Sequence, residues 1–400
     1  MKRGRRLCMV LHGPYPVGEG RVSNEARAAL DAGWEVDVVA MHKAGEPARE
    51  LVDGVDVHRL PLSHEWGGGG VAVAREYLGF TAMATAKVAV LTRRRGYTVV
   101  HVHNPPDFLI AAALVPRILG ARVVFDIHDF APELFAMRFG ARRGFGVANA
   151  LMQRVEALAT RFATAIVTVH DPYRRALEAR GVPAGKITVV LNSVDERLVP
   201  ATRSGSGSVT DEENGFRVVY HGTITPYWGV VLLIEAAAQV VPDVPNLRVE
   251  IYGDGDALPE VRARVSELGL SDRVHLSGRF LPQPEVLERV SLASVGVICN
   301  LPEKRNQTAI PTKLFEYARL GVPIATADLL AIREHFSADE VRFFRAGSAD
   351  DLADALREIA SFPEAARARA DAARQRYESY AWPVSARRYV ELLDRLDPGS

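Results

Sequence analysis

The chain is poor in cysteine and lysine and has no long apolar run. Its 400 residues include two cysteines, Cys8 and Cys299, each inside a short apolar segment. This excludes a disulfide framework and a cysteine-based zinc site, and it fits a reducing compartment. Apolar runs such as Leu7–Leu11 and Ile110–Val115 are too short for a signal-peptide core or a membrane-spanning helix. We therefore expect a soluble, cytoplasmic protein.

An excess of charge of either sign is also missing. The 49 basic and 49 acidic side chains give a formal net charge of zero. A nucleic-acid partner is not expected, because such binders usually show a basic excess. One segment, Met137–Phe145, mixes three arginines with two phenylalanines, which suits weak peripheral contact with an anionic membrane. We favour the alternative of a solvated loop and helix start, because mixed charge runs usually form solvated faces.

What the sequence has is a regular alternation of apolar strands and helical segments, typical of α/β folds with parallel sheets. The length exceeds one core, so two domains are expected, linked by the Gly/Ser-rich and then acidic segment 200–215. Each would be a Rossmann-like, doubly wound sheet, and the two would face each other across a ligand-binding cleft. The predicted strands are Leu7–Leu11, Glu35–Ala40, Val55–Leu60, Thr98–Val102, Arg122–Ile127, Ala165–Val169, Ile187–Val190, Arg217–Tyr220, Arg248–Tyr252, Val274–Ser277, Val295–Cys299, Val322–Thr326 and Val341–Phe344.

The most informative stretch is Pro311–Ile324. Pro311 suits the start of a helix, Gly321 suits its end, and an apolar strand follows. The free N–H groups of a first helical turn favour an anion, and Lys313 adds a positive charge there. Glu316 lies about one turn further on, on roughly the same face. The pattern fits either a grip for a nucleoside diphosphate or a helix with a basic first turn and a solvated glutamate.

Histidines and carboxylates follow two neighbouring predicted strands, as His101, His103, Asp126, His128 and Asp129. Residues two apart on a strand share a face, so the two histidines of His-Val-His could ligate a metal with an aspartate, as in a metal-dependent hydrolase. They could also be buried histidines bonded to backbone carbonyls. We prefer a third interpretation, in which these groups line a cleft and contact a sugar and an acceptor.

Glycine-containing turns follow three predicted strands, within His12–Arg21, His221–Thr223 and Tyr252–Asp256. None has the full G-x-G-x-x-G spacing of a dinucleotide-binding turn, so each by itself indicates only a turn. Their recurrence on both sides of the predicted linker is more informative than any single one.

On these residues the chain resembles retaining glycosyltransferases of the GT-B fold, in the family 4 group that includes bacterial sugar transferases. The similarity extends over nearly the whole chain. It is carried by Gly20–Arg21, His128–Asp129, Asn192–Asp195, Tyr220–Thr223, Tyr252–Gly255, Pro311–Pro323 and Tyr380–Trp382.

The resemblance implies transfer of a sugar, with retention, from an NDP-sugar to a hydroxyl or other nucleophile of a small-molecule, glycan or lipid-linked acceptor. It implies an acceptor-binding domain at 1–199, an NDP-sugar-binding domain at 216–375, and a last helix within 376–400 that packs back on the first domain. No metal or other cofactor is expected, because protein cations and helix N-termini would stabilise the departing diphosphate. The alternatives are a non-catalytic sugar-nucleotide-binding protein of the same fold and an NDP-sugar 2-epimerase.

The resemblance also assigns residues. Glu316 would bind the ribose hydroxyls, and Arg279 and Phe280 would line the nucleobase. The catalytic residues would be His128, Asp129 and Lys313. The acceptor would contact Gly20, Arg21 and His103. The donor would be bound by Gly222, Thr223, Trp228, Gly253, Arg279, Phe280, Thr308, Thr312, Lys313, Leu314 and Glu316.

Three positions depart from the family pattern. Thr308 stands where the family often has a first glutamate, with seven residues between it and the one at Glu316. Thr223 and Trp228 stand where an arginine and a lysine are common. These changes weaken the expected diphosphate grip unless other cations compensate, and they leave the sugar and even the activity open. Candidates for compensation are Lys304, Arg305, Lys313 and Arg279.

Overall fold

The computed structural model describes residues 4–16, 20–62, 70–139, 145–199 and 215–399. The chain forms two compact units, the first made of residues 1–192 and 383–400 and the second of residues 193–382. The predicted linker 200–215 lies, apart from Gly215, outside the described residues. The last helix, α14 (Trp382–Leu396), belongs with the first unit except for its first residue.

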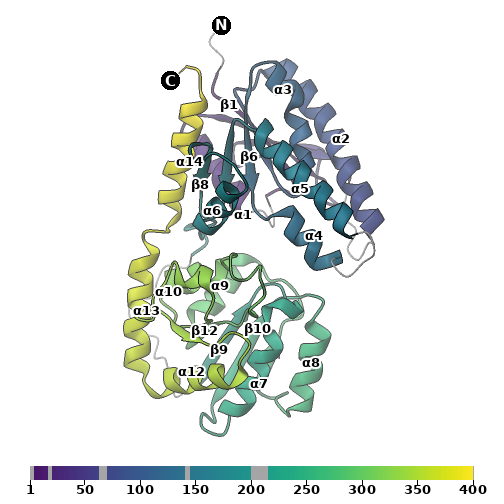
Figure 1. The fold of residues 1–400 in the computed structure, drawn as a ribbon. Coiled ribbons are helices and arrows are strands. Elements are labelled where there is room, and N and C mark those ends of the chain that lie inside the picture. The colour runs from purple at the N-terminus through teal and green to yellow at the C-terminus, as the bar shows by residue number, and fades with distance from the viewer. Residues whose placement is uncertain (1–3, 17–19, 63–69, 140–144, 200–214, 400) are drawn as a thin grey trace. The chain divides into compact units, whose positions relative to one another are not determined.

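The first unit is built on a sheet flanked by helices (Figure 1). The sheet has eight strands in the order β3-β4-β2-β1-β5-β6-β7-β8. All neighbouring strands are parallel except β3 and β4, which are antiparallel. The strands are β1 (Arg6–Pro14), β2 (Glu35–Met41), β3 (Arg49–Val52), β4 (Val55–Leu60), β5 (Val99–His103), β6 (Arg122–Ile127), β7 (Ala165–Thr168) and β8 (Ile187–Val189). The helices are α1 (Gly20–Asp31), α2 (Gly70–Arg95), η1 (Asp107–Ala113), α3 (Leu114–Ile118), α4 (Ala131–Phe139), α5 (Phe145–Phe162), α6 (Asp171–Ala179), η2 (Ala184–Lys186) and α14.

The second unit has a six-stranded, all-parallel sheet with strand order β11-β10-β9-β12-β13-β14. Its strands are β9 (Phe216–His221), β10 (Leu247–Tyr252), β11 (Val274–Leu276), β12 (Val295–Ile298), β13 (Ile324–Ala327) and β14 (Arg342–Phe344). Its helices are η3 (Pro226–Trp228), α7 (Val230–Val240), α8 (Leu258–Glu267), α9 (Gln283–Ser291), α10 (Thr312–Leu320), α11 (Leu330–Arg333), α12 (Ala349–Ser361) and α13 (Pro363–Tyr377).

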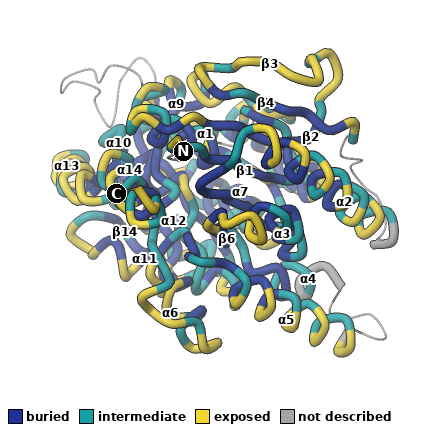
Figure 2. The backbone as a smooth tube through the Cα atoms, turned by 90° about the horizontal axis from the view of Figure 1, so that it is seen from above, coloured by how far each residue is buried: buried dark blue, intermediate teal, exposed yellow. Residues whose placement is uncertain are grey.

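The strands form where the sequence is apolar without alternation, because helices cover both faces of each sheet. In β1, residues 7–10 are fully buried. All thirteen predicted strands are present within three residues of their predicted ends. The additional strand β3 was missed because it is short and two of its four residues are charged. It forms an exposed antiparallel edge against β4 (Figure 2).

The strand order of each sheet reverses direction at one place, between β1 and β5 in the first unit and between β9 and β12 in the second. In doubly wound sheets the connections leave opposite faces at such a point, and the carboxyl ends of the two strands border a crevice where ligands bind. Several of the residues predicted from the sequence to carry chemistry, among them His103, Gly222 and Lys313, lie near these two places.

Candidate functional site

Helix α10 of the second unit begins and ends as its sequence dictates. The sequence predicts Pro311 as the start of the helix. In the structure the helix begins one position later, at Thr312, and Pro311 has extended backbone (φ −71°, ψ 127°). Gly321 ends the helix in the left-handed conformation, with φ +67°, where a side chain would be strained. The helix therefore presents its first turn, with Thr312 exposed and Lys313 buried, beside the end of β9.

Lys313 is a buried cation that is paired with an aromatic ring in place of an acid. Its side chain is 8% exposed, and its Nζ lies 3.8 Å from the centre of the Tyr220 ring. Among the described residues it makes no ion pair, and burial lowers its pKa to about 8. Gly222 lies in front of the ammonium, since a Cβ there would be 3.5 Å from Nζ. The backbone of Gly222, at φ +111°, also favours glycine.

Glu316 lies one turn after Lys313 and is held by two neighbours. His221 Nε2 lies 3.0 Å from its Oε2, and Gln283 Nε2 donates to its Oε1 at 3.2 Å. Burial raises the pKa of Glu316, but His221, Gln283 and Lys313 together bring it below its usual value. An ionised, oriented carboxylate therefore stands beside a buried ammonium at the end of β9.

The loops after β9 and β10 are packed backbone against backbone, which explains the glycine at Gly253. A Cβ at this position would lie 1.9 Å from the carbonyl oxygen of Gly222. The Gly222 N–H donates to the Tyr252 oxygen at 2.8 Å, and the Gly253 N–H donates to Ser277 Oγ at 2.9 Å. Gly222 and Gly253, both predicted to bind the donor, therefore form a closely packed backbone surface beside Lys313.

The other predicted donor residues lie at several places in the second unit. Thr223 is exposed in the loop after β9, and Arg279 and Phe280 are exposed after β11. Trp228 is half-buried in η3, with the Arg305 guanidinium carbon 5.5 Å from the centre of its ring. Arg305 thus lies near the position where the family commonly has a cation and this chain has a tryptophan.

Two members of that set make contacts within the second unit that the sequence did not predict. The side chain of Leu314 is fully buried, and its N–H donates to the Pro311 oxygen, so we revise its role from donor contact to support of the helix. The Thr308 hydroxyl donates to the Arg305 oxygen at 3.1 Å, so it shapes the loop that carries Arg305.

The first unit holds a second polar cluster, centred on Asp126 at the end of β6. Arg21 binds both of its carboxylate oxygens, at 2.8 and 3.0 Å. His103 Nδ1 and His128 Nε2 lie 3.2 and 2.9 Å from its Oδ2. Burial would raise the pKa of Asp126, but Arg21 and His128 hold it well below its usual value. His128 is the member with the most exposed side chain, at 20%.

Three further residues complete this cluster, and sequence reasoning gave two of them no role. Glu25 is fully buried 3.2 Å from Arg21, one turn along α1. Burial keeps the pKa of Glu25 well above its usual value. The Tyr389 hydroxyl lies 2.9 Å from His101 Nδ1, across 288 positions of sequence. The i, i+4 spacing of Arg21 and Glu25 was a signal in the sequence, whereas nothing local pointed to Tyr389.

The cluster contains potential metal ligands. Ligand atoms of Glu25, His101, His103 and Asp126 lie within 4.8 Å of one another. The Arg21 guanidinium already lies within 3.2 Å of both carboxylates and supplies the positive charge that a metal ion would otherwise bring to them. The arrangement is therefore a self-neutralised ionic network.

The burial of Arg21 and His103 corrects their predicted contact with an acceptor. They are 5% and 1% exposed, and Arg21 also donates to the Val190 oxygen. Both support Asp126. Gly20 is exposed at the start of α1, and His128 and Asp129 are partly exposed after β6. Asn104 fixes these last two residues by accepting from the His128 N–H at 2.8 Å and donating to the Asp129 oxygen at 2.7 Å.

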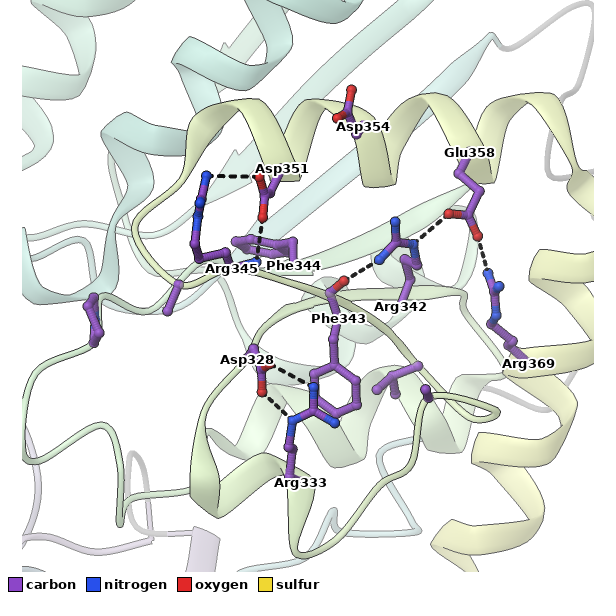
Figure 3. Close-up of a pocket in the computed structure, with 14 residues that line it drawn as sticks. Asp328, Arg333, Arg342, Phe343, Phe344, Arg345, Asp351, Asp354, Glu358 and Arg369 are labelled. Atoms are coloured by element: carbon purple, nitrogen blue, oxygen red, sulfur yellow. Dashed lines mark hydrogen bonds and ion pairs between the residues drawn. The ribbon is translucent and has the colours of Figure 1, made fainter.

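A separate hollow of about 800 Å³ lies around β14 and α12 in the second unit (Figure 3). Its arginines are all engaged: Arg333 with Asp328, Arg345 with Asp351, and both Arg342 and Arg369 with Glu358. An anion would have to break one of these ion pairs, so the hollow is a poorer phosphate site than Lys313.

Two family models match the chain. "Glycosyl transferase 4-like domain" matches residues 18–193, and "Glycosyl transferases group 1" matches residues 215–361. Alpha-D-kanosaminyltransferase of Streptomyces kanamyceticus is 25% identical over 305 residues, which cover 72% of this chain and 73% of that protein. Exopolysaccharide phosphotransferase SCO2592 of Streptomyces coelicolor is 28% identical over 186 residues, which span 46% of this chain and 18% of that protein.

Solved structures share the fold. Sucrose-phosphate synthase of Thermosynechococcus elongatus superposes with a TM-score of 0.77 at 18% identity, covering 99% of this chain and 100% of that one. HepE of Anabaena in complex with UDP-glucose gives a TM-score of 0.70 at 16% identity, covering 98% and 99%. Within the described ranges, no helix is both long and apolar enough to span a bilayer.

Proposed function

Because the chain is a glycosyltransferase of the GT-B fold, belonging to the family 4 or group 1 type, we propose that it transfers a sugar, with retention, from an NDP-sugar to an acceptor nucleophile. The observation that carries this proposal is the buried ammonium of Lys313, which makes no ion pair with a described side chain, although the charge of Glu316 one turn away acts on it. A buried charge without a partner is costly, and an incoming anion would remove that cost.

The group around Lys313 matches the parts of a nucleoside diphosphate. The ammonium and the exposed first turn of α10 suit two phosphates, which helix N-termini and lysine both favour. The ionised Glu316 suits the two hydroxyls of a ribose, since a carboxylate accepts hydrogen bonds from both. The complex of HepE with UDP-glucose supports a nucleotide sugar as the donor.

In this proposal the second unit binds the donor and His128 borders the reacting sugar. Asp126, held ionised by Arg21, accepts from His128 and fixes the direction of its ring. Lys313 and the amides of the first turn of α10 would stabilise the departing diphosphate, so no metal is required by the scheme. We place the protein in the cytoplasm, where sugar nucleotides would be its substrates.

Two measurements test the proposal. Thermal shift against a panel of nucleoside diphosphates and NDP-sugars should raise the melting temperature, because a ligand of the native state stabilises it. Wild-type protein should then release the nucleotide from the stabilising NDP-sugar when an acceptor is supplied. Stabilisation without turnover would favour a sugar-nucleotide-binding protein. Conversion of the NDP-sugar to its 2-epimer, without release of the nucleotide, would favour a 2-epimerase. If no member of the panel raises the melting temperature, the assignment of a donor site at Lys313 is wrong.

A further inference from the structure

Large apolar side chains are exposed on two helices of the first unit. Of the fourteen such side chains among the described residues, six lie on α3, α5 and the residue after α3. Ile118 is 81% exposed, Leu151 61% and Leu158 65%. Scattered exposed leucines are normal in a soluble protein, but a local concentration usually marks a binding surface.

The exposed residues of α5 form one stripe. Val147, Leu151, Arg154, Leu158 and Arg161 are separated alternately by four and three positions and are all exposed. This spacing places them on a single face of the helix. The opposite face, which includes Ala159, packs against the core of the unit. The helix is therefore apolar on both faces, and its outer face also carries arginines.

Helix α3 lies next to the end of α5 and extends the stripe. The Arg117 guanidinium carbon lies 4.5 Å from the centre of the Phe162 ring, which places the end of α3 against the last residue of α5. Lys186 Nζ donates to the Thr160 oxygen at 2.6 Å and adds a cation at the same end. We call the combined set the α5–α3 surface: Leu114, Arg117, Ile118, Val147, Leu151, Arg154, Leu158 and Arg161.

The charge of this surface has one sign although the whole chain is neutral. Residues 114–122 and 146–163 contain four arginines and a single acid, Glu156. Glu156 is buried and accepts from Arg180 at 2.7 Å, so it does not offset the exposed arginines. The surface therefore combines aliphatic side chains with an uncompensated positive charge.

We propose that the α5–α3 surface docks the protein on an anionic lipid bilayer. Leucine and isoleucine would enter the boundary between head groups and acyl chains, and the arginines would meet lipid phosphates with their stems lying along the apolar region. Each arginine near an anionic surface strengthens such binding. This assignment does not depend on the identity of the donor or acceptor.

The same observations disfavour two other occupants. A second copy meeting this face through a two-fold axis would bring the three arginines of each copy together, six in all, with no exposed acid between them, which is repulsive. The exposed apolar residues of the α5–α3 surface are all aliphatic, whereas the centres of protein interfaces are enriched in aromatic side chains. The segment predicted to touch a membrane, Met137–Phe145, has side chains outside the described residues, and the inference uses none of them.

The test is co-sedimentation of the full chain with vesicles of phosphatidylglycerol and phosphatidylcholine, compared with vesicles of phosphatidylcholine alone. We expect binding to the anionic vesicles only, weakened when salt rises from roughly 0.05 to 0.5 M. The pair Leu151→Ser/Leu158→Ser and the pair Arg154→Gln/Arg161→Gln should each lower the partition coefficient about tenfold or more. The control pair Leu51→Ser/Leu330→Ser, at equally exposed positions elsewhere, should leave it unchanged.

Thermal unfolding of each variant checks that the fold is intact, which exposed positions should allow. Absence of wild-type binding to anionic vesicles would overturn the proposal. An equally large fall in the partition coefficient of the control pair Leu51→Ser/Leu330→Ser would also overturn the proposal. Light scattering that shows a dimer dissociated by the leucine pair would assign the surface to a second copy of the chain instead.

Discussion

The two units each bury charged side chains at the point where their sheet order reverses, but they balance the charge differently. In the first unit Arg21 contacts both Glu25 and Asp126, and the charges are neutralised internally. In the second unit Lys313 is buried against a tyrosine ring and makes no ion pair among the described residues, and Glu316 one turn away is instead within contact distance of His221. A neutralised network can hold a side chain such as His128 in place, whereas an unbalanced cation is suited to binding. The following predictions test this contrast.

The largest expected effect is on the stability of the first unit. Arg21→Met removes the cation from two buried carboxylates, and breaking a buried pair in this way costs about 3–5 kcal/mol. Chemical denaturation should show the loss. Arg27→Met on the same helix is the control, because Arg27 is 39% exposed and lies 3.8 Å from Asp53. Similar stabilities of the two variants would mean that the cluster is not a neutralised network.

Lys313→Met should have the opposite effect on stability. Burial lowers the pKa of Lys313 more than Glu316 raises it, so removing this cation should leave the protein as stable or raise its stability by about 1–3 kcal/mol. The same change should weaken nucleoside-diphosphate binding about tenfold to a hundredfold, the usual value of a charge-assisted contact. Calorimetric titration and thermal unfolding measure the two effects. Lys304→Met is the exposed control, and a destabilised Lys313→Met with unchanged binding would contradict the contrast between the units.

The two units also differ in how far the sequence predicts them. The alternation of apolar and polar segments predicts nearly every strand, because a parallel sheet covered on both sides needs continuous apolar runs. The pairing of Lys313 and Glu316 could be predicted because both lie on one helix, within one turn. Such local spacing is what a sequence shows directly.

The first unit's cluster could be predicted only in part. His103, Asp126 and His128 were singled out, but burial of the histidines was only one of three alternatives, and Arg21 and His103 were expected to touch an acceptor. Tyr389 enters the cluster from the last helix, and no local pattern encodes a contact across 288 positions. Packing of distant segments therefore decided which of these polar groups reach solvent.

Glu316→Gln should produce a smaller and ligand-dependent effect. The amide keeps the shape of the side chain but removes the negative charge that His221 and Lys313 stabilise. We expect about a tenfold weaker affinity for a ribonucleoside diphosphate. Affinity for the 2′,3′-dideoxy analogue should change little, because it lacks the hydroxyls that the carboxylate would accept. Equal losses for both ligands in calorimetry would place Glu316 away from the ribose.

Both the stability of the protein and its affinity for a diphosphate should depend on pH, because the pKa of Lys313 is lowered. Its folded value of about 8 lies below the 10.5 of a free lysine, so the unfolded chain binds more protons between these values. The contribution of Lys313 to stability therefore rises with pH from about 8 to about 10.5, while diphosphate affinity falls over the same range. Binding at pH 8 should take up a proton, seen as a heat that depends on the ionisation enthalpy of the buffer. Lys313→Met should show no such dependence.

The smallest expected effect concerns Tyr389, which tests whether the neutralised network is also fully bonded. Tyr389→Phe removes the hydroxyl 2.9 Å from His101 Nδ1 and leaves a buried ring nitrogen without that bond. Such a loss costs about 1–2 kcal/mol. Tyr380→Phe in the second unit, whose hydroxyl donates to the His335 oxygen at 3.2 Å, is the control because its ring is less buried. In denaturant unfolding Tyr389→Phe should be the less stable variant. If it matches the control, the bond to His101 adds nothing beyond the ion pairs of Arg21, and charge neutralisation alone holds the network together.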